Sequence, residues 1–212
     1  MRTAYFDCIA GASGDMMLGA LVDAGLPPEE LKAELAKLHL KDFHLHIDRV
    51  SKNAFSAVKV DVHVHDDTPE RHLADLRKVV EDSDLSDPVK KTAIRIFTRI
   101  CEAEAAIHDS TVDKVHLHEV GGVDAIVDVC GTLAGLEVLG IEKVHVSPFP
   151  LGRGFVSGAH GQIPLPAPAA QAFAGARLLV IYCNCWAGAA FRELNRATQL
   201  PPRRFAFNCW LL

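Results

Sequence analysis

The stretch Ala4-Tyr-Phe-Asp-Cys-Ile9 is a short apolar run that breaks into Gly11-Ala-Ser-Gly-Asp15, and residues 16–24 then carry apolar side chains at helical spacing. A brief apolar run, closely spaced glycines and a helical period are the pattern of a strand that turns directly into a helix. We therefore predict a strand, a glycine loop and a helix within residues 4–24.

Helical and extended patterns alternate along the rest of the chain. Phe43–Val50 and Phe55–His65 each alternate apolar and polar residues, so we predict a β-hairpin that turns through Ser51-Lys-Asn53. Further helices are predicted from residue 27 and at 73–83, 87–108, 123–140 and 169–174, with a strand at 143–146 and strand fragments in the Pro- and Gly-rich segment 147–168. This pattern predicts an α/β protein of mixed α+β type, with several helices packed on short mixed sheets.

Composition narrows the functional class. The chain has 212 residues, of which 49% are hydrophobic, so it can bury a substantial core. Its net charge of −5 argues against nucleic acid as a partner, and no apolar run is long enough to cross a membrane. Acidic residues interrupt the apolar stretch near the N-terminus, which argues against a secretory signal peptide. The six cysteines form no C-x-x-C pair and are too sparse for a disulfide scaffold. We expect a cytoplasmic protein with reduced thiols.

The glycine loop is the first candidate site. Backbone N–H groups and the helix dipole at Ser13 and Gly14 can hold a phosphate or carboxylate, although no Walker-type lysine follows. Asp7 and Asp15 can instead coordinate a hard cation. Two structural alternatives stay open: a tight turn that needs glycine, and an ordinary first-turn acid at Asp15.

The densest set of potential metal ligands is His116-Leu-His118-Glu119 followed by Asp124 and Asp128. In an extended segment the two imidazoles share one face, and the two aspartates lie one helical turn apart. Imidazole with carboxylate suits divalent nickel, zinc or iron. The alternative is a pair of surface histidines beside a helix whose first turns are acidic.

Two other segments carry candidate groups. His63 and His65 lie on the polar face of the predicted hairpin, with His72 at the start of the next helix, and such a cluster either binds a borderline metal or is a solvated strand edge. His160 and Arg153 lie in the Pro- and Gly-rich segment, where fixed loops position side chains and an arginine can meet an anion.

Three segments together resemble the LarC family of nickel insertion proteins. They are Tyr5-Phe-Asp-Cys-Ile-Ala-Gly-Ala-Ser-Gly-Asp-Met-Met-Leu-Gly-Ala-Leu21, His118-Glu-Val-Gly-Gly-Val-Asp-Ala-Ile-Val-Asp128, and Ser147-Pro-Phe-Pro-Leu-Gly-Arg-Gly-Phe-Val156 leading to His160-Gly-Gln-Ile-Pro-Leu-Pro-Ala-Pro168. The resemblance implies insertion of nickel into pyridinium-3,5-bisthiocarboxylic acid mononucleotide by a CTP-dependent cyclometallation, a lyase activity. The product is the nickel-pincer cofactor, which lactate racemase accepts downstream.

With this resemblance we assign roles to the candidate residues. Metal ligands are His116, His118, Asp124 and Asp128, together with His63 and His65. Glu119 is the catalytic base that takes up the displaced proton. Asp7, Ser13, Gly14, Asp15, Arg153 and His160 are assigned to the substrate or its phosphate. Whether the protein forms a homo-oligomer stays open.

The chain also departs from the family pattern. We expect an amino-terminal LarC-like domain at 1–176 and a divergent tail at 177–212, in which five Arg and one Glu give a net charge of +4 against −9 for the rest. The family continues into a carboxy-terminal domain thought to bind CTP with a divalent cation, and some members join the two halves by a programmed frameshift. We therefore expect this chain to be the first half, a tail of out-of-frame origin, and no activity without the carboxy-terminal half.

Two other classes of function stay open on the same residues. A metal-dependent hydrolase would use the His and Asp set around an activated water. A non-catalytic nickel carrier would bind the metal without turning anything over.

Overall fold

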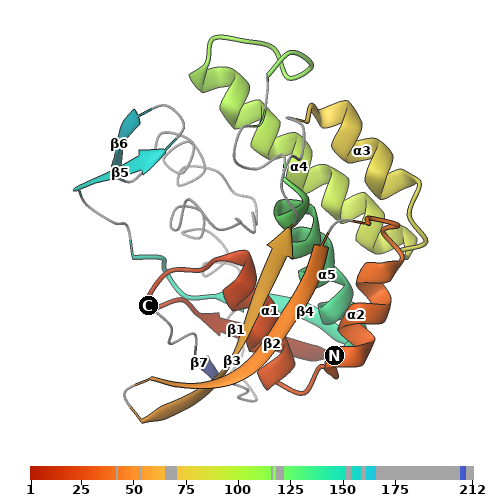
Figure 1. Ribbon diagram of the computed structural model, residues 1–212, viewed down its shortest axis with the longest axis vertical. Coiled ribbons are helices and arrows are strands. Elements are labelled where there is room, and N and C mark those ends of the chain that lie inside the picture. The colour runs from red at the N-terminus through yellow and green to blue at the C-terminus, as the bar shows by residue number, and fades with distance from the viewer. Residues whose placement is uncertain are drawn as a thin grey trace.

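A computed structural model describes residues 1–41, 43–52, 54–64, 71–115, 117, 122–150, 154–158, 161–165 and 206–208. Its helices are α1 (Gly14–Asp23), α2 (Pro28–Ala36), α3 (Leu73–Glu81), α4 (Asp87–Ile107) and α5 (Val123–Val138). Its strands are β1 (Arg2–Asp7), β2 (Phe43–Lys52), β3 (Phe55–Val64), β4 (Ile141–Val146), β5 (Gly154–Gly158), β6 (Gly161–Leu165) and β7 (Ala206–Asn208) (Figure 1). The predicted mixed α/β class is confirmed.

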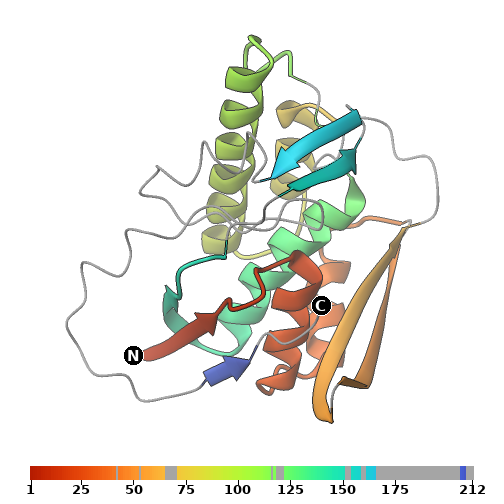
Figure 2. The same ribbon diagram turned by 90° about the vertical axis from the view of Figure 1, so that its left-hand side faces the viewer.

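The chain forms a small parallel sheet in the order β4-β1-β7. Ala4 and Phe6 are each 1% exposed and face the core, whereas Tyr5 between them is 39% exposed. Helices α1 and α5 cover the core face (Figure 2). The predicted strand, glycine loop and helix are confirmed, with the helix beginning at Gly14 because Ser13 caps it.

The predicted hairpin is confirmed as β2 and β3, which pair in antiparallel register from Phe43↔Val64 to Lys52↔Phe55. It lies across α1 (Figure 1), where a Cβ added at Gly19 would come within 2.6 Å of the Val58 carbonyl oxygen. A glycine in the middle of a helix costs about 0.5–1 kcal/mol relative to alanine, so close approach of the strand accounts for its use here. The side chain of Val60, on the inner face of the hairpin, is fully buried.

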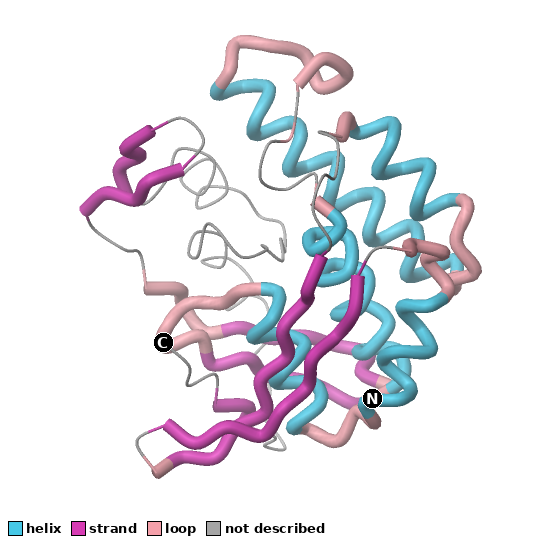
Figure 3. Tube along the Cα trace, in the orientation of Figure 1, coloured by secondary structure: helices cyan, strands magenta, loops and turns pink. Residues whose placement is uncertain are grey.

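Helix α5 is the central helix of the core. Most of its residues are buried. Leucine side chains from α1 and its neighbours pack directly on the glycines at 131 and 135, closer than they could approach a larger residue. Figure 3 shows α2, α3 and α4 gathered around it on one side of the β2–β3 hairpin. Among the described residues, no helix combines the length and apolar character that spanning a membrane requires.

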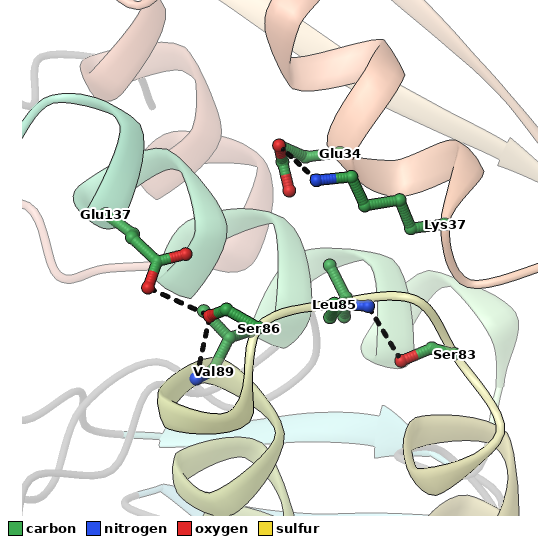
Figure 4. A network of polar contacts seen from close by, with 7 residues as sticks. All are labelled: Glu34, Lys37, Ser83, Leu85, Ser86, Val89 and Glu137. Carbon is green, nitrogen blue, oxygen red and sulfur yellow. Dashed lines mark hydrogen bonds and ion pairs between the residues drawn. The ribbon is translucent and has the colours of Figure 1, made fainter.

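Polar contacts fix the turn between α3 and α4 (Figure 4). The Ser86 hydroxyl donates to Glu137 Oε1 on α5 at 2.8 Å and accepts from Val89 N at 3.4 Å, so it caps α4 and ties that cap to α5. Ser83 is buried, and its hydroxyl accepts from Leu85 N at 3.4 Å. These contacts fix the turn between α3 and α4 and join it to α5.

The Pro- and Gly-rich segment forms an antiparallel pair, β5 with β6, which confirms the predicted strand fragments. The helix predicted at 169–174 lies outside the described residues. In the tail, Ala206–Asn208 adds a three-residue parallel edge to β1.

A chain that ends at residue 176 is expected to keep its melting temperature within a few degrees of the parent. The tail was predicted to be out-of-frame sequence, and its described contact with the sheet is the three-residue edge pairing of β7 with β1. Changes outside a core usually cost well under about 1 kcal/mol. Thermal unfolding of the two chains by circular dichroism measures the difference. Insolubility of the shortened chain, or a collapse of its melting temperature, would show that residues 177–212 belong to the core.

Candidate functional site

The carboxyl ends of β1 and β4 are tied together at one edge of the sheet. Ser147, directly after β4, donates its backbone N–H to Phe6 O at 2.9 Å, and its hydroxyl accepts from Cys8 N at 2.8 Å. Gly11 then turns the chain at φ 92°, a left-handed conformation that favours glycine, and its N–H donates to Cys8 O at 3.0 Å. Ligands of parallel α/β sheets bind beyond this end of the strands. Sequence analysis had not assigned a role to Ser147.

Three predicted residues form the start of α1. Ser13 is the N-cap, and its hydroxyl accepts from Met16 N at 3.3 Å. Gly14 is the first helical residue, and Asp15 lies in the first turn, where the helix dipole favours an acid. The cap explains the use of serine here on structural grounds, and phosphate binding by these residues stays a prediction.

The carboxylate of Asp128 lies against the start of α1. A Cβ added at Gly14 would overlap the carboxyl carbon and Oδ2 of Asp128, and the Asp128 side chain is 0% exposed. Helix α5 therefore brings a buried acid to the N-terminus of α1, whose dipole stabilises negative charge. The structure thus joins two motifs that are far apart in the sequence.

Asp124 lies one turn before Asp128 on α5, and its side chain folds back over Gly122, the N-cap of that helix. It is half-buried, whereas Asp128 is fully buried. The predicted spacing of the two aspartates is confirmed. Together they form an acidic line that runs from the start of α5 inward to the start of α1.

Asp7 does not join this line. It ends β1 on the face that carries Tyr5, opposite the core face of Phe6 and Cys8, because side chains alternate along a strand. Lys59 on β3 is a cation that interacts electrostatically with Asp15, in the first turn of α1. Its pKa is raised, first by its hydrogen bond to Asp61 and also by the negative charge of Asp15.

The second histidine cluster was predicted on the polar face of the hairpin and at the start of the next helix, and the structure places His63 and His72 at those positions. His63 lies on the exposed face of β3, opposite His44. His72 caps α3, and its Nδ1 lies 3.1 Å from Val115 O. His65, His116, His118, Glu119, Arg153 and His160 lie outside the described residues. Leu117 forms an antiparallel bridge with Arg71, in agreement with an extended conformation at that residue.

Thiolate ligands are disfavoured in the core. Burial raises the pKa of Cys130 to about 12, and burial with the nearby charges of Glu104 and Glu102 raises that of Cys101 to about 12. Both thiols are therefore neutral at physiological pH, and a neutral thiol is a poor metal ligand.

Residues 4–190 match the sequence profile of the family described as nickel insertion protein. The chain belongs to the nickel insertion protein family. It is 47% identical over 169 residues to the pyridinium-3,5-bisthiocarboxylic acid mononucleotide nickel insertion protein of Desulfitobacterium hafniense (strain DSM 10664 / DCB-2), covering 80% of this chain and 42% of the relative. No solved structure matches the chain.

Two more relatives whose names include the words nickel insertion protein have similar identity and coverage. One from Dictyoglomus thermophilum is 48% identical over 169 residues, covering 80% of this chain and 44% of its own length. One from Gloeobacter violaceus is 45% identical over 192 residues, covering 87% of this chain and 44% of its own length. The chain therefore spans less than half the length of these nickel insertion proteins. The family match passes residue 176, so the truncation described above directly tests the boundary proposed there.

Proposed function

We propose that this chain takes part in inserting nickel into pyridinium-3,5-bisthiocarboxylic acid mononucleotide, the substrate named for the Desulfitobacterium relative. The observation that carries the proposal is the contact between Asp128 and Gly14. It brings the acidic helix and the glycine loop, two of the segments that resemble the family, to one end of the sheet. Nickel is the substrate metal in this proposal.

In this proposal Asp124 and Asp128 supply oxygen donors from one face of α5, and His116 and His118 supply nitrogen donors. Imidazole and carboxylate together suit divalent nickel. Asp128 is the inner donor, because it is fully buried, and it also holds the start of α1 against α5. The half-buried Asp124 is the outer donor, to which the incoming ion binds first.

The acidic side chains at the start of α1 also affect where the phosphate of the mononucleotide can bind. A phosphate at Ser13 and Gly14 would meet the Asp128 carboxylate, whereas a cation would be attracted to it. The geometry therefore supports a cation beside Asp15 and Asp128, and we assign the phosphate to Arg153 and His160 in the Pro- and Gly-rich segment.

The insertion step follows from these assignments. A bond forms between nickel and pyridinium C4 as the C4–H bond breaks, and Glu119 accepts the released proton. The two thiocarboxylate sulfurs then coordinate the metal, which completes the pincer. A carboxylate positioned at the reacting carbon can act as such a base when it is within hydrogen-bonding reach of the proton.

The remaining parts of the proposal concern the protein as a whole. CTP and its divalent cation are handled by the length of the relatives that this chain does not span, and the overall reaction is a lyase-type cyclometallation in the cytoplasm. The finished cofactor passes to lactate racemase. A non-catalytic nickel carrier would share the metal site but not the turnover.

We expect the 212-residue chain to bind one to two nickel ions, and the double variant His116→Ala/His118→Ala to lose most of that binding. Both imidazoles are predicted to share one face, so removing them deletes the nitrogen donors together. Titration calorimetry with NiCl₂ measures the affinity. His108→Ala, an exposed histidine at the end of α4 beside Glu104, is the control and should bind as the parent does. Unchanged affinity in the double variant would exclude these ligands.

A further inference from the structure

The outer face of the β2–β3 hairpin gathers three histidines from two strands. His44 lies directly opposite His63 in the register, and His46 lies two residues further along the same face of β2. The rings of His44 and His63 are stacked with centroids 4.9 Å apart and planes 13° apart, and the ring of His46 meets that of His63 edge-on at 6.1 Å. All three side chains are exposed.

We propose that His44, His46 and His63 form a binding site for a borderline divalent metal ion such as Ni²⁺ or Zn²⁺. Imidazole nitrogen is a preferred donor for these ions. An ion that holds two imidazoles at about 2.1 Å in tetrahedral geometry separates their ring centres by roughly 5 Å. The His44 and His63 rings already have that separation, so metal binding requires the rings to turn without moving the strands.

Asp48 supplies the supporting contact that metal-binding histidines commonly have. Its Oδ2 lies 2.7 Å from His46 Nε2. An Nε2–H that donates to this carboxylate leaves the lone pair on Nδ1, which can then bind a metal, and such a carboxylate also fixes the ring orientation. Asp61, opposite His46 in the register, adds negative charge on the same face and pairs with Lys59 at 2.8 Å.

The rings as they stand are stacked and do not converge. No group of three or more His, Cys, Asp or Glu side chains in the described part of the chain is arranged as a finished metal site. Exposed side chains change rotamer in picoseconds to nanoseconds, so turning these rings is a fast local motion. The backbone that carries them is held by continuous antiparallel pairing over the whole hairpin and by burial of Val60 on its inner face.

This site is separate from the His116–Asp128 segment that carries the proposed nickel insertion chemistry, because its three histidines and Asp48 all lie on the hairpin. His63, which the sequence analysis grouped with His65, is here grouped with His44 and His46. The test is therefore made in the full 212-residue chain carrying His116→Ala/His118→Ala. That background lacks the tighter nickel site, and we expect the weaker binding that remains to be saturable with both Ni²⁺ and Zn²⁺ in a calorimetric titration. His44→Ala, and separately His63→Ala, should weaken it at least tenfold, and Asp48→Ala should weaken it about 10–100-fold, the usual effect of losing such a supporting contact.

A second measurement identifies the ligands directly. In proton NMR spectra Ni²⁺ should broaden the ring signals of His44, His46 and His63 before those of His108, which has a carboxylate partner but no neighbouring histidine of this cluster. The variant His108→Ala is the matched control for affinity and should bind as the background does. Equal affinity in the background and in His44→Ala, or broadening that spares all three hairpin histidines, would overturn the proposal whatever the outcome for His116 and His118.

Discussion

Replacing Gly14 with alanine should lower the melting temperature by roughly 2–12 °C and disrupt nickel binding at α5. The added methyl group would overlap the carboxyl group of Asp128, whose side chain is completely buried, so one of the two groups must shift. Overpacking of this kind costs about 1–3 kcal/mol, and each kcal/mol shifts the melting temperature of a domain of this size by about 2–4 °C. Differential scanning calorimetry and nickel titration provide the two measurements.

Two further variants separate packing from chemistry at this contact. Asp128→Asn keeps the shape of the side chain and removes its charge, so it should weaken nickel binding while the fold is retained. Gly14→Ala combined with Asp128→Gly removes the overlap, so the pair should be less unstable than the sum of the single changes. If Gly14→Ala melts with the parent, the close approach of α5 to α1 is wrong.

A polypeptide of these 212 residues alone should form no nickel cofactor from the bisthiocarboxylate mononucleotide. It covers only 42% of the length of the Desulfitobacterium relative that is named for this substrate, and we assign CTP handling to the remainder. Addition of a second polypeptide that corresponds to that remainder should restore formation of the cofactor. The product is measured by mass spectrometry and by activation of lactate racemase lacking its cofactor.

Three outcomes distinguish the proposed classes of function. Product from the chain alone would contradict the division of labour between the two polypeptides. Nickel binding with no product in the presence of the second polypeptide would favour a carrier. Hydrolysis of small esters or amides with added zinc would favour a metal-dependent hydrolase, and an Asp128→Asn variant should then lose that activity as well.

Most of the helices and strands could be predicted from the sequence, because the residue patterns that specify them are local. Alternation of Val58, Val60 and Val62 predicted the buried face of the hairpin, and the structure confirms it. The strand predicted at 143–146 in fact begins at Ile141, since its pairing with β1 starts there. Boundaries of this kind depend on pairing with the partner strand, and the periodicity of one segment carries no information about that pairing.

The contacts of the candidate site were harder to predict because they join distant segments. Two glycines near Ser13 indicated a phosphate loop or a tight turn, and nothing local indicates that Gly14 makes room for Asp128. The pairing of His44 with His63 was accessible in principle, because the alternation of each strand and the position of the turn together set the register. His63 was instead grouped with His72, which lies nearer in the sequence but caps α3.

The parallel pairing of β1 with β4 also has a consequence for the order of folding. The β2–β3 hairpin consists of contacts between near neighbours in the chain, and such a unit forms in about 1–10 μs. Strand β1 can meet β4 only after the intervening helices have come together, and closing so long a loop is slow. The edge where Cys8 meets Ser147 should therefore be among the last parts of the molecule to form, and hydrogen exchange during refolding should protect the Cys8 amide well after those of the hairpin.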